Sequence, residues 1–102
     1  MTVYAVILTN EALADSERLQ DFLTVNNDPL ELGLMSFLTN AFKVLTHQPG
    51  IGRPMKEGLR ELILERGASG YIAKYSIDRA ALTVRVLRFR HQKEIGYPTI
   101  NY

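Results

Sequence analysis

Cysteine is absent from the 102-residue sequence, and so is any apolar run long enough to cross a membrane. Without thiols, the chain can form neither disulfide bonds nor thiolate metal sites. A membrane-spanning helix needs about 20 consecutive apolar residues, and no charged-then-apolar leader is visible either. Internal repeats, low-complexity tracts and linkers are also missing. We therefore expect a single domain over residues 1–102, located in the cytoplasm and without contact with a membrane.

A strong excess of either charge is absent from the chain as a whole, whose formal net charge is +1. The two halves nevertheless differ, because residues 1–52 contain two cations and six acids, whereas residues 53–102 contain ten cations and five acids. This asymmetry favours an acidic partner, such as nucleic acid or an acidic peptide. The alternative is that the cations only solvate an exposed sheet face, and charge alone leaves both interpretations open.

The first residues predict a strand and a helix. Thr2–Leu8 is rich in β-branched and aromatic residues and apolar on both sides, which predicts a strand covered on both faces. A helix is expected over 11–25 after a cap at Thr9 or Asn10. Asp15 is one of three acids early in this helix, where the macrodipole favours negative charge. The apolar residues fall partly on one helical face: Leu13, Leu19, Phe22 and Leu23.

A second helix is predicted from Pro29 to about Thr46, with Asp28 as its N-cap. Its core stripe follows helical spacing: Leu34, Phe37, Leu38, Ala41 and Leu45. Met35 and Phe42 lie off this stripe, where they either pack on the first helix or form an apolar patch for a partner. Two helices joined by a few residues form a helical hairpin, which can cover one face of a sheet.

The second half predicts a turn and three strands. Gln48–Pro54 contains two glycines and two prolines and is typical of a turn. Gly58–Glu65 follows as a strand. Tyr71–Ile77 and Leu82–Phe89 then form a hairpin around the polar turn Asp78–Ala81.

The last strand changes its alternation part-way. Val84 and Val86 alternate with a polar residue, but Leu87 and Phe89 shift the apolar set by one position, which predicts a β-bulge near Val86–Arg88. The order of elements predicts an α+β fold, β-α-α-β-β-β, in which the helical hairpin packs on one face of a small, mainly antiparallel twisted sheet.

Catalytic motifs of high specificity are missing: there is no phosphate loop, no pair of metal-ligand histidines and no serine elbow. Neither a metal nor a cofactor is therefore expected. His91 is the notable histidine, because it lies among Arg88, Arg90 and Lys93, with Tyr97 six residues later. One interpretation is a site that acts on nucleic acid, in which the imidazole is a base, the cations bind phosphate and the tyrosine ring stacks on a nucleobase. Binding of an acidic surface without catalysis is the other.

The order and spacing of these segments resemble the toxins of the RelE/ParE superfamily, the toxic partners in bacterial type II toxin–antitoxin modules. The resemblance covers nearly the whole chain, and its most specific pieces are Pro49–Pro54 (PGIGRP), Leu59–Leu62, Gly70-Tyr71 with Tyr75, Arg90–Glu94, and Gly96-Tyr97. It implies a small α+β toxin of this superfamily's fold, neutralised by a cognate antitoxin, ParD-like or RelB-like, that wraps it with a C-terminal segment.

The superfamily implies two different activities. RelE-like members cut mRNA on the ribosome, and His91 and Tyr97 stand at positions that match their catalytic residues. The arginine expected directly after Gly-Tyr is Ile72 here, which removes a charged phosphate donor. ParE-like members, associated with plasmid stabilisation, instead poison DNA gyrase by binding, and the PGIGRP turn and the RHQKEIGY ending look more ParE-like.

We therefore predict a ParE-like toxin that inhibits DNA gyrase. The alternatives are a RelE-like ribosome-dependent mRNA endoribonuclease with His91 and Tyr97 as catalytic residues, and a degenerate member that only binds an antitoxin or DNA. The residues expected to contact the target or the antitoxin are Arg53, Lys56, Arg60, Lys74, Arg88, Arg90, Lys93, Met35 and Phe42.

Overall fold

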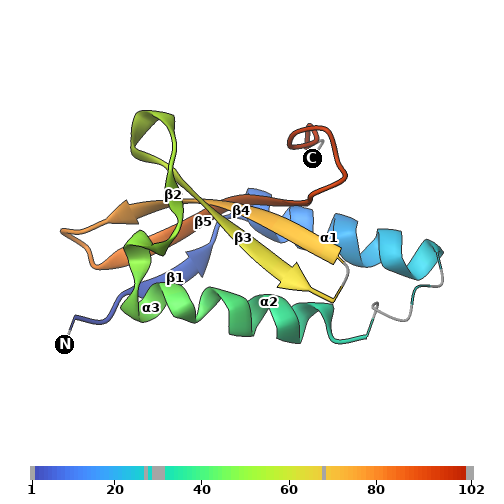
Figure 1. Ribbon diagram of the computed structural model, residues 1–102, viewed down its shortest axis with the longest axis horizontal. Helices are drawn as coiled ribbons and strands as arrows, with labels where there is room; N and C mark the ends of the chain where they lie inside the picture. The colour runs from blue at the N-terminus through green and yellow to red at the C-terminus, as the bar shows by residue number, and fades with distance from the viewer. Residues whose placement is uncertain (1, 27, 29–31, 68, 101–102) are drawn as a thin grey trace.

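A five-stranded sheet forms one layer of the computed structural model, and helices form the other (Figure 1). The structure describes residues 2–26, 28, 32–67 and 69–100. The elements are β1 (Ala5–Leu8), α1 (Asn10–Val25), α2 (Leu34–Phe42), α3 (Val44–His47), the short 3-10 helices η2 (Pro49–Ile51) and η3 (Lys56–Gly58), β2 (Arg53–Pro54), β3 (Arg60–Arg66), β4 (Ser69–Asp78) and β5 (Thr83–His91). The strand order is β1-β5-β4-β3-β2, with β1 parallel to β5 and the other pairs antiparallel. The predicted α+β class and mainly antiparallel sheet are confirmed.

Strand β1 lies at one edge of the sheet, because β5 is its one strand partner among the described residues. Val6 and Leu8 face the helices and pack against the core, whereas the side chain on the other face, Ile7, is 45% exposed. The prediction of a strand covered on both faces is therefore wrong. An apolar run does not reveal whether a second layer covers the opposite face of the sheet.

Helix α1 begins after Thr9, whose Oγ1 accepts a hydrogen bond from the Ala12 N–H, as the sequence predicted. Leu19 and Leu23 are buried against the sheet, but Leu13 and Phe22 are 45% and 60% exposed. The face that packs on β5 instead carries small and polar residues: Ala12, Asp15 and Ser16. Close approach of a helix to a strand explains why small side chains occupy these positions.

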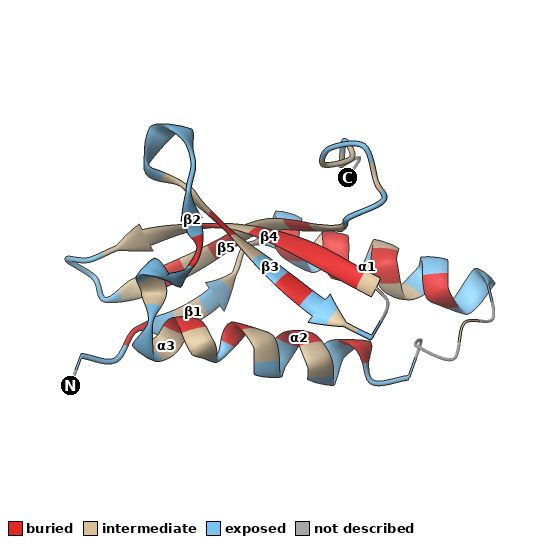
Figure 2. Ribbon diagram, in the orientation of Figure 1, coloured by how far each residue is buried: buried red, intermediate tan, exposed pale blue. Residues whose placement is uncertain are grey.

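Helix α2 begins at Leu34, with Gly33 in the left-handed region (φ 84°) as its N-cap, so the predicted helical start after Asp28 is wrong for the described residues; Pro29 lies outside them. The predicted stripe is confirmed: Leu34, Leu38 and Leu45 are fully buried, with Phe37 and Ala41 packed beside them. Phe42 was placed off the stripe, yet it is only 4% exposed and its ring lies 6.0 Å from that of Phe89. Figure 2 shows this buried layer along α2 and β4.

The β4–β5 hairpin contains the predicted bulge. Lys74 lies opposite Arg88, but the next residue, Tyr75, lies opposite Val86, so Leu87 is an extra residue on β5. The bulge allows both Val86 and Phe89 to face the core, where both are fully buried. None of the described helices is long and apolar enough to span a membrane.

The PGIGRP turn is fastened to the sheet by Tyr75. The Tyr75 hydroxyl donates to the Pro49 carbonyl (2.6 Å) and accepts from the Gly52 N–H (2.8 Å). The guanidinium of Arg60 adds bonds to the carbonyls of Gly50 (3.1 Å) and Gly52 (2.7 Å). A Cβ atom on Gly52 would lie 2.6 Å from the Tyr75 hydroxyl and 2.7 Å from the Glu61 carbonyl, so glycine is required for this close contact.

Gly52→Ala is therefore expected to lower the free energy of unfolding by about 1–3 kcal/mol, because an added methyl group has no space beside Tyr75. Gly50→Ala is the matched control, since a Cβ at Gly50 meets nothing within 4 Å, and should stay within about 0.5 kcal/mol of wild type. Urea denaturation followed by circular dichroism measures both. Equal midpoints for the two variants would contradict the packing argument.

Candidate functional site

A row of charged side chains crosses the sheet face opposite the helices. Arg53, Glu61, Lys74 and Arg88 are consecutive cross-strand partners on β2, β3, β4 and β5. Glu61 is 7% exposed and binds Arg53 at 2.9 Å, so one cation of the row is neutralised within it. The sheet therefore brings together cations that are up to 35 positions apart in the sequence.

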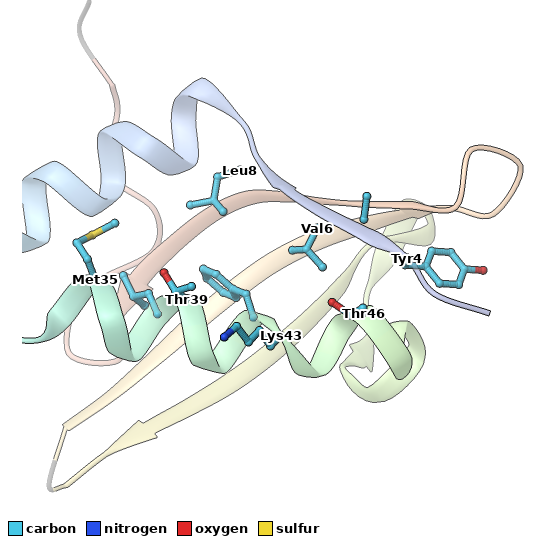
Figure 3. Close-up of a pocket in the computed structure, with 10 residues that line it drawn as sticks. Tyr4, Val6, Leu8, Met35, Thr39, Lys43 and Thr46 are labelled. Atoms are coloured by element: carbon cyan, nitrogen blue, oxygen red, sulfur yellow. The ribbon is translucent and has the colours of Figure 1, made fainter. Parts of the chain in front are cut away.

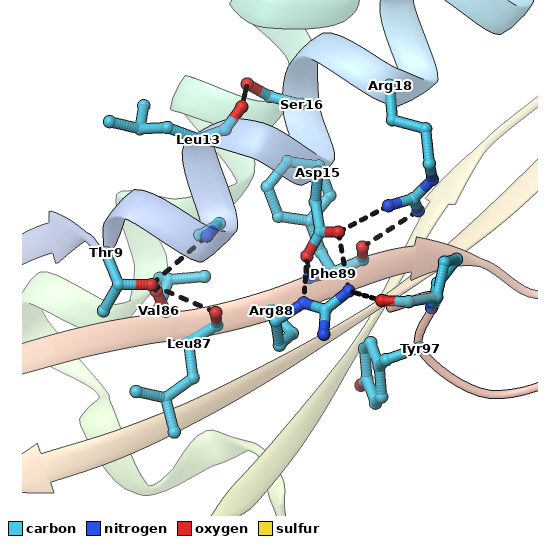
Figure 4. A network of polar contacts seen from close by, with 12 residues as sticks. Thr9, Leu13, Asp15, Ser16, Arg18, Val86, Leu87, Arg88, Phe89 and Tyr97 are labelled. Atoms are coloured by element: carbon cyan, nitrogen blue, oxygen red, sulfur yellow. Dashed lines mark hydrogen bonds and ion pairs between the residues drawn. The ribbon is translucent and has the colours of Figure 1, made fainter. Parts of the chain in front are cut away.

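The chain after β5 returns toward this row and places the Tyr97 ring against Lys74 and Arg88 (Figure 4). The Tyr97 ring centroid lies 4.6 Å from Lys74 Nζ, 5.5 Å from the Arg88 guanidinium carbon and 5.4 Å from that of Arg90. We call Lys74, Arg88 and Arg90 the cation cluster. Such distances are those of cation–π contacts, so the ring is a neutral partner for three positive charges.

The Tyr97 hydroxyl donates to Glu61 Oε2 at 3.2 Å. Burial, and then the negative charge of Glu61, raise the pKa of Tyr97 far above its ordinary value. The phenol therefore stays protonated at every physiological pH. It can donate a hydrogen bond, but it cannot serve as a base.

Asp15 of α1 holds this end of β5 from the side of the helix (Figure 4). Its carboxylate is fully buried and accepts from Arg88 Nε (2.7 Å), Arg88 Nη2 (3.0 Å) and the Phe89 N–H (3.0 Å). Arg18, one turn further along α1, also binds it. Arg88 is thus committed to a buried ion pair, and Asp15 has a structural role that differs from the predicted macrodipole effect.

The returning tail is tied to the same network. Glu94 accepts from Arg18 (2.9 Å) and from the His91 N–H (2.9 Å), and its carbonyl accepts from Arg90 (2.7 Å). Arg88 also donates to the Pro98 carbonyl. The position of Tyr97 therefore depends on contacts that begin at α1.

His91 lies on the other side of the sheet. It is the cross-strand partner of Tyr71, a core residue, and their rings meet edge to face at 5.3 Å. Arg90 and Tyr97 belong to the opposite face. The structure therefore does not bring His91 and Tyr97 together, although the sequence analysis considered them as one catalytic set.

The other predicted contact residues are divided among three places. Arg53 is bound to Glu61 with its side chain 65% exposed, and Arg60 holds the PGIGRP turn from the helix side. Lys56 is exposed in η3, and Lys93 is exposed in the tail that follows β5. In the described part of the chain, no group of three His, Asp or Glu side chains is placed to hold a metal ion.

Met35 and Phe42 meet at a different surface, a groove of about 340 Å³ between β1 and α2–α3, which we call the β1–α2 groove (Figure 3). Its lining residues are Tyr4, Ala5, Val6, Leu8, Met35, Leu38, Thr39, Phe42, Lys43 and Thr46. Met35 is 45% exposed at its rim, while buried Phe42 contributes to its floor. The groove is mostly apolar, and Lys43 is the charged residue of its lining.

Comparison with known proteins identifies the family. A family model described as "ParE toxin of type II toxin-antitoxin system, parDE" matches residues 6–96. The chain belongs to this ParE toxin family. The predicted resemblance to the RelE/ParE superfamily is thereby confirmed, and this chain is a toxin of the type II toxin–antitoxin class.

Solved structures agree with the fold of this ParE-family chain. The chromosomal ParDE toxin–antitoxin system from P. aeruginosa matches with a TM-score of 0.72 and 24% identity, covering 89% of this chain and 98% of that one. The RelBE2 toxin–antitoxin complex from Mycobacterium tuberculosis matches with a TM-score of 0.60 and 28% identity, covering 88% and 99%. No curated protein sequence gives a significant match.

Three residues of the site were missed by the sequence analysis: Asp15, Glu61 and Glu94. Each is an acid that binds cations from another element, and only the strand register shows which cations these are. The separation of His91 from Tyr97 could have been predicted from the sequence, because adjacent strand residues such as Arg90 and His91 point to opposite faces of the sheet.

Asp15→Asn is expected to lower the free energy of unfolding by about 3–5 kcal/mol, since it leaves two arginines beside a buried position without their carboxylate. Glu17→Gln, on the exposed side of α1, is the control and should change it by less than about 0.5 kcal/mol. Urea unfolding at low temperature measures both. A small effect at Asp15 would show that the ion pairs contribute little to stability.

Proposed function

We propose that this toxin inhibits DNA gyrase in the manner of ParE-like proteins and does not cleave RNA. The observation that carries the proposal is the arrangement of His91 and Tyr97, which lie on opposite faces of the sheet, with the Tyr97 hydroxyl bound to Glu61. Membership of the ParE toxin family supports the same function.

Cleavage of an RNA phosphodiester needs a base to activate the attacking hydroxyl and an acid for the leaving group, both within hydrogen-bond reach of the same phosphate. His91 contacts the Tyr71 ring on the helix side of the sheet, away from the cation cluster. Tyr97 remains protonated because its pKa is raised. The charged face of the sheet thus offers cations and a phenolic donor, but neither residue supplies the base.

Inhibition by binding requires no acid or base in the site. Ile72, where the resemblance expects an arginine of the nuclease, is 9% exposed and lies between Ile63 and Arg90 on neighbouring strands. An apolar side chain there is compatible with a binding surface. A bound target requires shape and charge complementarity and no proton transfer.

The β1–α2 groove is the proposed docking site of the antitoxin. Ala5 and Thr9 direct their N–H groups to β5, so Val6 and Leu8 direct theirs to the open edge of β1 that borders the groove. At the other end, the Tyr4 N–H donates to the Thr46 carbonyl (2.9 Å) and closes the edge. An extended segment can add to an open edge while its apolar side chains enter the groove.

The purified toxin, freed of antitoxin, tests the proposed target in two assays. We expect inhibition of DNA supercoiling by gyrase with accumulation of cleaved DNA complexes, and no cutting of mRNA on programmed ribosomes. Tyr97→Phe should leave gyrase inhibition within about threefold of wild type, since the proposed mechanism uses no proton of Tyr97.

Codon-positioned mRNA cleavage that disappears in Tyr97→Phe or His91→Ala would instead establish the ribosome-dependent endoribonuclease. Inactivity in both assays, together with normal growth of cells that express the chain alone, would establish a degenerate partner that binds only the antitoxin or DNA.

Met35→Glu tests the antitoxin groove. A carboxylate at the rim of an apolar groove must be desolvated when a segment docks there, so affinity for the cognate antitoxin should fall at least tenfold. Met55→Glu, at a 40% exposed methionine beyond β2, is the matched control and should bind as wild type does. Isothermal titration calorimetry measures both. Loss of binding in Lys74→Ala with no effect of Met35→Glu would move the antitoxin to the sheet face.

A further inference from the structure

The network around Tyr97 contains more positive charge than its carboxylates neutralise. The residues in contact are the cations Arg18, Arg53, Lys74, Arg88 and Arg90 and the acids Asp15, Glu61 and Glu94. Asp15 binds two arginines, and Glu61 and Glu94 bind one each. In the described part of the chain, Lys74 and Arg90 form no ion pair, and the buried Arg90 Nε has no hydrogen-bond partner.

The Tyr97 ring occupies the place where an anion would satisfy these cations. An aromatic face carries only a quadrupole, so it interacts with a cation more weakly than a charged oxygen does. The tail is anchored at Glu94 and at Pro98, but between these two residues Gly96 has a positive φ of 66° with open space around it, and Ile95 is completely exposed. Such a cover can be displaced by a partner that binds the cations better.

We propose that the cation cluster is a binding site for the phosphodiester backbone of a nucleic acid, and that Tyr97 covers this site until the segment around Gly96 moves aside. Lys74 and Arg90 bind the phosphate oxygens directly, while Arg88 remains fixed by Asp15 and orders the site from its edge. This site goes beyond the proposed function, because inhibition of gyrase by binding does not require the toxin itself to contact nucleic acid.

A string of phosphates fits this surface better than a single carboxylate. Across the sheet, the charged row continues from the cluster to Arg53 on β2, whose side chain is 65% exposed. The acid within the row, Glu61, is buried and paired with Arg53. Cations that extend across one sheet face are the electrostatic footprint of a polyanion.

Fluorescence anisotropy with a labelled 20-nucleotide oligo-dT and an oligo-U of equal length tests the site at low salt. Tyr97→Ala is expected to bind both probes about tenfold more tightly than wild type, because the closed population that competes with the ligand is lost. Tyr97→Phe keeps the ring but loses the bond to Glu61, so it should lie between the two. If three phosphates are bound, the slope of log affinity against log salt is roughly −2.

Lys74→Ala and Arg90→Gln each remove one cation of the cluster and should weaken binding and reduce the magnitude of that slope by about 0.7. Arg79→Ala removes an exposed cation at the far turn of the hairpin and should stay within twofold of wild type. Circular dichroism confirms the fold of each variant. Equal binding of the two probes supports a site for the shared backbone, and a preference for oligo-U supports the same site with added contacts to the 2′-hydroxyl.

Weaker binding by Tyr97→Ala would overturn the proposal that the ring is a cover and would make it part of the binding surface. Affinities that respond equally to Arg79→Ala and Lys74→Ala would overturn the site itself. Displacement of the probes by a polyglutamate peptide of equal charge, as effectively as by unlabelled oligonucleotide, would overturn the nucleic-acid assignment in favour of an acidic peptide.

Discussion

The buried carboxylate of Asp15 is the contact on which this end of the molecule depends. Through Arg88 and the Phe89 N–H it fixes the strand just after the bulge, and Arg88 extends the connection to the Pro98 carbonyl. Through Arg18 and Glu94 it fixes the start of the tail. Helix, sheet and tail are thus joined at one point, and an acid of α1, between the helix and the sheet, positions charges of the opposite sheet face (Figure 4).

The periodicity of the sequence was sufficient to predict most helices and strands and the bulge, because a spacing of 3.6 or 2 residues follows directly from helix and strand geometry. It could not show that β1 is exposed on one face, since that depends on what the other elements cover. Phe42 was misplaced for a related reason: the buried arc of α2 is wider than the stripe, because both β1 and Phe89 lie against it.

The candidate site was only partly predictable. Its cations were identified, but their partners Asp15, Glu61 and Glu94 come from three different elements, and strand register determines these pairs. Several residues of the motifs that resemble the family have a structural role. Arg60 and Tyr75 fasten the PGIGRP turn, and Gly70 leaves space for Gln92, whose side chain would lie 2.2 Å from an added Cβ. Residues of this kind reveal the fold but say little about the target.

The parallel pairing of β1 with β5 joins the beginning of the chain to its end. Ala5 lies beside Thr83, and Leu8 beside Val86, so the partners are separated by 78 residues in the sequence. Contacts of such long range form late, because the intervening chain must first be synthesised and ordered. During translation, β1 therefore has no strand to join until β5 has left the ribosome. The row of charged side chains, which includes Arg88 of β5, is incomplete in the nascent chain until that point.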